Sequence, residues 1–299
     1  MFKRIPFELF FEILARLPVK SMLRSTCVYK SWNALISSPS FVNAHLDWNA
    51  KKSAGGYGGY LLISTSNAKC LSLFSAQTYI KCLDFKLPRD LISSSFSVFS
   101  SCSGLLCISD ATFDSCMYLW NPSIRKMKKL PKCLIYCTQF AITTLGFGFN
   151  RGENDYKVVR IVKTGCAESI CKAEVYSVRL DSWRRIRSFV PLVSHNAYLQ
   201  DKNACLNGVV YWIVEDFSPR CYSILSFDLR SESFQTMTLP ERLVSVINTT
   251  SNAISIQVLK KSLSLLHLRQ NVNDRYCDIW VLGRDTWKMT QLFFRKVER

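Results

Sequence analysis

The sequence contains few of the residues on which catalytic and metal sites usually depend. Its 299 residues include three histidines, His45, His195 and His267, which lie far from one another in the chain. It has no Walker-type phosphate loop, no Gly-x-Ser-x-Gly elbow and no two histidines at helical spacing. Most carboxylates fall at expected turns or strand ends, where capping is their usual role. We therefore expect no catalytic residue, no cofactor and no metal.

Long apolar segments are also missing. No run approaches the roughly 18 apolar residues that a membrane-spanning helix requires. The first residues lack the charged, apolar and small-residue regions of a signal peptide. We therefore expect a protein of the cytoplasm or nucleus that makes no membrane contact.

The 13 cysteines fit such an environment as free thiols. Spacings such as Cys102/Cys107 and Cys133/Cys137 lack the two-residue gap of zinc knuckles. We interpret the cysteines mainly as small apolar core residues. Cysteine catalysis would need a histidine nearby in space, and the sequence selects no such pair.

Acidic residues are scarce, with 22 Asp and Glu against 39 Lys and Arg, which gives a net charge of +17. The densest basic run spans residues 125–129, and a smaller cluster contains Arg184, Arg185 and Arg187. Neither has a helix-turn-helix, finger or RNP-type aromatic pattern. Lysines that guard a solvated strand edge are the simplest interpretation of the run. An acidic protein partner and a nucleic acid are the alternatives.

The first 46 residues hold more apolar surface than so short a helical segment can bury. Pro6 suits a helix start, and Pro18 stops the first helix at or before Leu17. We expect further helices over 19–25, over 28–36 and from Ser40 to about Leu46. A helical unit below roughly 40 to 50 residues is marginal without a staple, metal or partner. No metal-ligand pattern lies in this segment, so a protein partner is expected.

The segment also resembles a known family. Leu17-Pro18-Val19-Lys20-Ser21, Lys30-Ser31-Trp32 and Pro39-Ser40-Phe41 resemble the F-box of plant F-box proteins that carry an F-box-associated, kelch-like propeller domain. The similarity covers residues 2–46. Ile5 stands where leucine is usual, and Tyr29 replaces the common serine. The resemblance implies docking on the Skp-family adaptor of a cullin-RING ubiquitin ligase.

The resemblance also implies which side chains contact the adaptor. They are Ile5, Pro6, Leu9, Ile13, Leu14, Leu17, Pro18, Val19, Leu23, Val28, Trp32 and Leu35. Packing of the helices against one another is the alternative role for each of them, and for Trp32 above all. As a set, they exceed what internal packing needs.

The remainder of the chain indicates a repeated β unit. Residues 49–59 are glycine-rich and are expected to form a flexible linker between an F-box module at 1–48 and a β domain at 60–299. In the β domain an apolar strand, a polar turn and a second strand recur about every 50 residues, the period of kelch-like propeller blades. The first aromatic residues of the five copies are Phe74, Trp120, Tyr176, Phe227 and Trp280.

We therefore predict an all-α F-box module followed by an all-β, propeller-like domain with about five repeats. Three later motifs, around Gly104, Gly148 and Gly208, also resemble landmarks of the F-box-associated domain. Members of that family usually continue past the segment that resembles residues 279–292. The last blade is therefore expected to be missing, or the ring to close differently.

Three functions follow as hypotheses. The first is the substrate receptor of an SCF-type ubiquitin ligase, which holds an unknown target protein and performs no bond chemistry itself. The second is a basic propeller that binds nucleic acid or another polyanion, with salt-dependent affinity. The third is a propeller hydrolase, which requires a buried acidic cluster in the central channel.

Overall fold

The computed structural model describes most of the chain. The described residues are 5–54, 60–64, 70–75, 78, 80–86, 96–110, 116–136, 142–164, 170–191, 197–217, 220–249, 254–259, 261–270, 275–283 and 286–294. The chain forms two compact units, one made of Met1–Ser95 with Trp120–Met127 and the other of Phe96–Leu119 with Lys128–Arg299.

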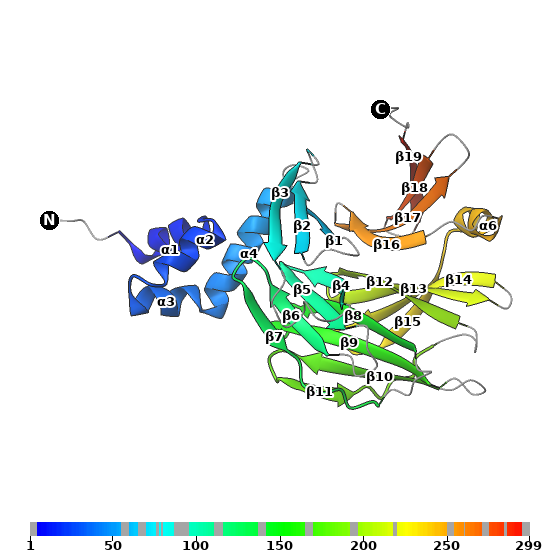
Figure 1. The fold of residues 1–299 in the computed structure, drawn as a ribbon, viewed down its shortest axis with the longest axis horizontal. Coiled ribbons are helices and arrows are strands. Elements are labelled where there is room, and N and C mark those ends of the chain that lie inside the picture. Colours follow the sequence, from blue (N-terminus) through cyan, green and yellow to red (C-terminus); the bar gives the residue numbers. More distant parts are fainter. Residues whose placement is uncertain are drawn as a thin grey trace. The chain divides into compact units, whose positions relative to one another are not determined.

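Helices open the chain, as expected (Figure 1). They are α1 (Phe7–Ala15), α2 (Val19–Ser25), α3 (Lys30–Ile36) and α4 (Pro39–Ala54). Helix α2 has the predicted bounds, and Pro18 separates it from α1. Helix α3 begins two residues later than predicted.

Helix α4 is longer than the sequence indicated. It continues to Ala54 instead of ending near Leu46, so the first part of the predicted linker is helical. No proline or glycine interrupts this stretch until Gly55, which explains why the helix can continue. The rest of the predicted linker, residues 55–59, lies outside the described residues.

The helices share a small core. Leu14, Ala15, Ile36 and Phe41 are buried, and Phe10 and Phe11 pack against them. Helix α4 contacts both α1 and α3. In the described part of the chain, no helix is both long and apolar enough to cross a membrane.

After α4, most of the described residues lie in strands, which form five sheets, each made of strands that follow one another in sequence (Figure 1). The three-stranded sheet contains β1 (Tyr60–Ser64), β2 (Cys70–Ser75) and β3 (Lys81–Lys86). The first four-stranded sheet contains β4 (Phe96–Cys102), β5 (Leu105–Asp110), β6 (Met117–Asn121) and β7 (Lys126–Lys129).

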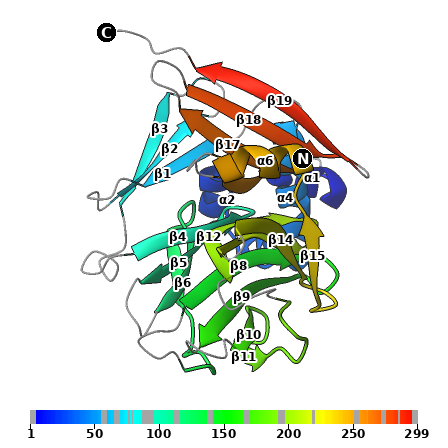
Figure 2. The ribbon, with the colours of Figure 1, turned by 90° about the vertical axis from the view of Figure 1, so that its right-hand side faces the viewer.

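The second four-stranded sheet contains β8 (Ile142–Asn150), β9 (Asp155–Thr164), β10 (Ile170–Ser177) and β11 (Ser182–Arg185). Figure 2 shows these four strands side by side in chain order. The third contains β12 (Ala197–Leu206), β13 (Val209–Phe217), β14 (Arg220–Asp228) and β15 (Phe234–Thr238). The fourth contains β16 (Ile254–Leu259), β17 (Ser262–Gln270), β18 (Arg275–Leu282) and β19 (Trp287–Phe294).

Four of the five predicted repeats are therefore complete four-stranded blades. The first repeat, around Phe74, has three strands among the described residues. The prediction of about five repeats is thus confirmed only in part: four complete blades are present among the described residues, and the first repeat does not form a fifth. Helix α6 (Glu241–Thr249) was not predicted; it lies between the third and fourth blades in sequence and buries Leu243 and Ile247.

The recurring aromatic residues occupy equivalent positions. Trp120, Tyr176, Phe227 and Trp280 each lie in the third strand of a four-stranded blade. Tyr176 faces Trp183 on the neighbouring strand, with ring centroids 5.4 Å apart. Such cross-strand aromatic pairs stabilise adjacent strands.

Two tight turns join consecutive strands. Asn207 and Gly208, between β12 and β13, have φ angles of 52° and 81°. Ser103 and Gly104, between β4 and β5, have φ angles of 48° and 82°. Positive φ at both central residues is the signature of the type I′ hairpin, whose twist matches that of the flanking strands.

The first strands of the four complete blades lie against one another. Strand β12 contacts β4, β8 and β16, and β4 contacts β8. Apolar residues then fill the space between consecutive blades, which gives separate cores between β4–β7 and β8–β11, between β8–β11 and β12–β15, and between β12–β15 and β16–β19. This arrangement is that of a β-propeller.

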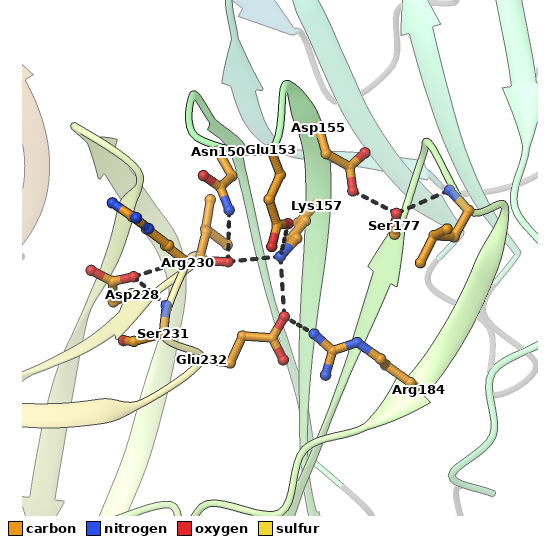
Figure 3. A network of polar contacts seen from close by, with 12 residues as sticks. Asn150, Glu153, Asp155, Lys157, Ser177, Arg184, Asp228, Arg230, Ser231 and Glu232 are labelled. Carbon is orange, nitrogen blue, oxygen red and sulfur yellow. Dashed lines mark hydrogen bonds and ion pairs between the residues drawn. The ribbon is translucent and has the colours of Figure 1, made fainter.

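A polar network also ties the second and third blades together (Figure 3). Lys157 on β9 is 3% exposed, and its Nζ donates to the backbone oxygen of Leu229 at 2.8 Å. The same Nζ forms ion pairs with Glu153 Oε2 at 2.7 Å and with Glu232 Oε1 at 3.1 Å. A buried cation needs such compensation, because desolvation without partners is costly. The network therefore fixes one blade on the next.

Candidate protein-interaction site

Helix α1 carries an apolar stripe that its own module leaves in solvent. Leu9 and Ile13, four residues apart on α1, are 55% and 52% exposed, and Ile5, which precedes the helix and its N-cap Pro6, is 59% exposed. That spacing places side chains one above the other on the same side of a helix. Phe7, which the predicted contact set did not include, is 61% exposed. The stripe is therefore available to another polypeptide.

The exposed surface continues beyond α1. Pro6 and Pro18 are exposed. Val28 and Tyr29, which directly precede α3, have side chains that are 56% and 63% exposed. Tyr29 was recognised in the sequence as a departure from the family pattern, and its exposure adds it to this surface. We define the α1 face by the exposed apolar residues of this region: Ile5, Pro6, Phe7, Leu9, Ile13, Pro18, Val28 and Tyr29.

Other residues of the predicted contact set are partly covered. Leu17, Val19, Leu23, Trp32 and Leu35 are of intermediate exposure. Leu17 and Leu35 pack against the core of the helices. Trp32 lies against Phe10 and Tyr29, with ring centroids 4.9 Å and 5.7 Å apart, so internal packing accounts for much of its surface.

Leu14 packs inside the helical module, whereas the sequence-based prediction placed it at the adaptor contact. It is 3% exposed and belongs to the core with Ala15 and Phe41. Its neighbour Ile13 points into solvent, because adjacent helical residues lie about 100° apart around the axis. We correct the prediction for Leu14 and assign it to internal packing.

A charged border accompanies the apolar stripe. Arg16 Nη2 donates to Glu12 Oε2, four residues earlier on the helix, at 2.8 Å. The Arg16 guanidinium also lies 4.7 Å from the ring centroid of Trp48. Both partners of this ion pair are more than half exposed, so its contribution to stability is small. The surface therefore combines exposed apolar side chains with a charged border.

The basic run forms β7, the edge strand of the first four-stranded blade. Lys128 pairs with Asp181 at 2.9 Å, and the Lys129 ammonium lies 6.0 Å from the ring centroid of Tyr118. The interpretation as an edge strand guarded by lysines is therefore confirmed.

The described histidines are buried within the fold. His45 is 7% exposed, and its Nε2 lies 3.2 Å from the backbone oxygen of Leu17. His267 is fully buried and lies opposite Asp278 on the neighbouring strand. The distance from His267 Nδ1 to Asp278 Oδ2 is 3.7 Å. His195 lies outside the described residues. Among the described residues, no cluster of His, Cys, Asp or Glu could hold a metal ion.

Comparison with known proteins agrees with this architecture. Residues 2–43 match the F-box domain, and residues 66–296 match the F-box associated beta propeller domain. The chain belongs to the plant F-box proteins with an F-box-associated propeller. The α1 face of this F-box protein thus lies within its matched F-box.

Curated relatives of this F-box protein come from Arabidopsis thaliana. The F-box/kelch-repeat protein At3g23880 is 32% identical over 249 residues, which cover 79% of this chain and 65% of that protein. The putative F-box protein At1g47790 is 28% identical, over 79% of this chain and 59% of that protein. The F-box protein CPR1 is 25% identical, over 95% of this chain and 71% of that protein. The chain therefore spans about 60–70% of the length of these relatives.

Solved structures show weaker likeness to this F-box protein. A thermostable family-43 glycoside hydrolase has a TM-score of 0.47 and 9% identity, over 80% of this chain and 91% of that chain. A structure from a study of prolyl endopeptidases has a TM-score of 0.42 and 10% identity, over 80% of this chain and 34% of that chain. Neither likeness assigns an activity to this protein.

Proposed function

We propose that this F-box protein is the substrate-recognition subunit of an SCF-type ubiquitin ligase. Its F-box binds a Skp-family adaptor, and through the adaptor it joins a cullin-RING ligase. Its β-propeller holds a target protein. The proposal places the protein in the cytoplasm or nucleus, where such ligases act.

The observation that supports the proposal best is the exposed apolar stripe on α1. Three aliphatic side chains, Ile5, Leu9 and Ile13, are each more than half exposed although the module has an apolar core of its own. Burial of one such side chain contributes about 1.5–3 kcal/mol. A contiguous apolar surface of this kind marks an interaction site.

On this proposal the protein is a non-catalytic receptor. It accelerates ubiquitin transfer by proximity, because a target held on the propeller is presented at high effective concentration to the conjugating enzyme. The loops that connect strands at one end of a propeller are the usual place for such binding. The proposal assigns no side chain to proton transfer or to nucleophilic attack.

The adaptor contact can be tested with substitutions on the α1 face. The full chain carrying Leu9→Asp is co-expressed with a plant Skp-family adaptor, and the adaptor recovered with the chain is quantified. We expect recovery to fall at least a hundredfold, because the change removes about 2 kcal/mol of apolar burial and places a charge in the contact. Pro18→Asp should act in the same direction.

Leu180→Asp provides a matched control. Leu180 is 57% exposed against 55% for Leu9, and it lies in a turn of the propeller. It should leave adaptor recovery within twofold of the original chain. Unchanged recovery with Leu9→Asp and Pro18→Asp, in chains that remain folded by circular dichroism, would refute adaptor binding through the α1 face.

A further inference from the structure

The edge strand of the second blade, β11, lies beside the irregular segment that follows β7. This segment spans residues 130–136. Trp183 Nε1 on β11 donates to the backbone oxygen of Pro131 at 2.9 Å, and Arg185 Nη2 lies 3.4 Å from that of Leu134. Donors and acceptors advance in the same order along the chain, so the segment and β11 run in the same direction and contribute to one surface.

A buried ion pair holds the segment in this place. Glu174 on β10 is fully buried, and its Oε2 accepts the backbone N–H groups of Leu134 and Ile135 at 2.9 Å and 3.1 Å. Its other carboxylate oxygen binds the guanidinium of Arg160. The same guanidinium donates to the backbone oxygen of Ile135 at 2.9 Å. The segment is therefore fixed before any partner arrives, which lowers the entropy cost of binding.

Three side chains of this fixed segment are exposed. Tyr136 is 83% exposed, Leu134 is 47% exposed, and Lys132 is exposed as well. Single apolar side chains in solvent are ordinary on protein surfaces. Here two of them stand within a few residues of one another on a rigid backbone, among cations.

Strands β10 and β11 add positive charge to the same surface. Arg185 lies opposite Glu174, so both side chains are on the face that the segment crosses. The backbone N–H of Ile186 donates to β10 at 2.8 Å and continues the ladder one residue past β11. Because residues two apart on a strand share a face, Arg187 follows Arg185, and Lys172 on β10 precedes Glu174.

We define the basic face by the exposed residues of this surface: Lys132, Leu134, Tyr136, Lys172, Arg185 and Arg187. The stretches that contribute most of it carry charge of one sign. Residues 128–136 contain three lysines, residues 182–191 contain three arginines, and neither stretch contains Asp or Glu. Such a cluster of like charges attracts a partner of the opposite charge.

The acidic groups around this surface are bonded to other cations. Asp181 pairs with Lys128 at 2.9 Å. Glu174 is fully buried beneath the segment in its own ion pair. Arg184 alternates to the opposite face of β11, where it binds Glu232 (Figure 3). The basic face therefore keeps its excess of positive charge.

We propose that the basic face binds an acidic segment of the target protein that also carries large apolar side chains. Its carboxylates pair with Lys132, Arg185 and Arg187, and its apolar side chains contact Leu134 and Tyr136. The segment belongs to the target of the proposed function, so this assignment rests on that function. A single-stranded nucleic acid fits less well, because it needs successive aromatic platforms, and Tyr136 is the one aromatic residue of the basic face.

Binding can be measured by fluorescence anisotropy with the purified full chain. The probe is a fluorescein-labelled peptide that repeats Glu-Glu-Leu-Glu-Glu-Phe twice. We expect saturable binding that weakens as salt rises, because exposed charges are screened. A peptide with serine at the leucine and phenylalanine positions keeps the charge and should bind at least tenfold more weakly. Polyuridine of the same length is the nucleic-acid probe and should also bind more weakly.

Charge reversal on the basic face is the first test. The double variant Lys132→Glu with Arg187→Glu should weaken binding of the Glu/Leu/Phe peptide at least tenfold. Arg242→Glu with Lys288→Glu is the matched control, because it changes the net charge equally at exposed residues of α6 and β19. The control should stay within twofold of the original chain.

The apolar contribution is tested at a residue without charge. Tyr136→Ser should weaken peptide binding at least threefold. Tyr29→Ser, at an exposed tyrosine of the F-box, should leave it unchanged. Circular dichroism of each variant establishes that the fold is kept, and Tyr136 is so exposed that its replacement removes little packing.

Three results would overturn the assignment: no saturable binding of the peptide, equal losses in the two charge-reversal pairs, or tighter binding of polyuridine that is lost with Lys132→Glu and Arg187→Glu. Adaptor recovery separates this assignment from the proposed function. The double variant of the basic face should recover the adaptor within twofold of the original chain. Normal adaptor recovery without peptide binding would refute the basic face alone, whereas peptide binding at the basic face without any adaptor recovery would refute the proposed function.

Discussion

Replacement of Gly146 by alanine tests how closely β8 packs on β13. A methyl group at this position would lie 2.3 Å from Trp212 Cζ2 and 2.7 Å from Val210 Cγ1. Both neighbours are fully buried, so neither can move into solvent. The Trp212 indole also donates to the backbone oxygen of Leu145 at 2.9 Å, and a displaced ring would lose this bond.

The cost follows from these contacts. Overpacking of a filled core costs about 1–3 kcal/mol. A buried N–H left without its acceptor costs about 1–3 kcal/mol more. Alanine regains about 0.5–1 kcal/mol relative to glycine through the lower entropy of the unfolded chain. We therefore expect Gly146→Ala to lower the free energy of unfolding by about 1–5 kcal/mol.

Urea unfolding followed by tryptophan fluorescence and circular dichroism measures this difference. Gly152→Ala is the matched control, because the nearest atom to its added methyl group is Asn150 Oδ1 at 3.4 Å. The control should stay within about 0.5 kcal/mol of the original chain. Equal unfolding midpoints for the two variants would refute the packing argument.

Two other predictions follow from buried ionisable groups. Lys157→Met should lower the free energy of unfolding by about 3–5 kcal/mol, because it leaves Glu232 without its buried cation. Arg184→Met removes a half-exposed partner of the same carboxylate and should lower the free energy of unfolding by less than about 1 kcal/mol. Equal losses of stability in Lys157→Met and Arg184→Met would contradict the assignment of the buried cation as the main partner of Glu232. Burial raises the pKa of the Cys107 thiol from 9.0 to about 12. As pH rises, this thiol therefore ionises in the unfolded chain before it ionises in the folded chain. The free energy of unfolding should fall between about pH 9 and about pH 12, because the unfolded state then binds fewer protons. Cys107→Ala should flatten this fall in urea midpoints measured at pH 8, 9 and 10, and an unchanged slope would contradict the assignment to Cys107.

The sequence predicted the elements whose signals are local. Pro18 separates α1 from α2 because proline disfavours helix in the residue before it. Asn207-Gly208 carries a local turn signal, because asparagine and glycine adopt the positive φ of a two-residue hairpin more readily than other residues. Helix α6 was missed because its apolar signal, Leu243 and Ile247, is short and interrupts a series of strands.

Contacts between blades could not be predicted in the same way. The sequence identified Gly148 as part of a motif that resembles the F-box-associated domain, yet nothing in the chain indicates that Cys205 would lie against it. Lys157 reads as an ordinary polar residue of a strand, and it is buried only because Glu232 and Leu229 come from the next blade. Such partners are about 75 residues apart in sequence, and the register between blades has no local signal.

The candidate site illustrates the same limit within one helix. Helix α1 is apolar on most of its circumference, so hydrophobicity alone cannot separate Ile13 from Leu14. The structure separates them, because α4 covers the side that carries Leu14 and Phe41 joins the same core. The contact set predicted from the sequence was therefore a union of core and surface residues.

This separation connects stability to docking. Four described side chains, Leu14, Ala15, Ile36 and Phe41, form the buried core of the helical module, which is small for a unit of this length. On the proposed function, an adaptor bound to the α1 face adds about 2.7 kcal/mol of stability at a concentration of a hundred times its Kd. Leu14→Ala should weaken both folding and docking, whereas Leu9→Asp should weaken docking alone because Leu9 is already in solvent. The stripe therefore serves the partner, and the core holds the helices ready for it.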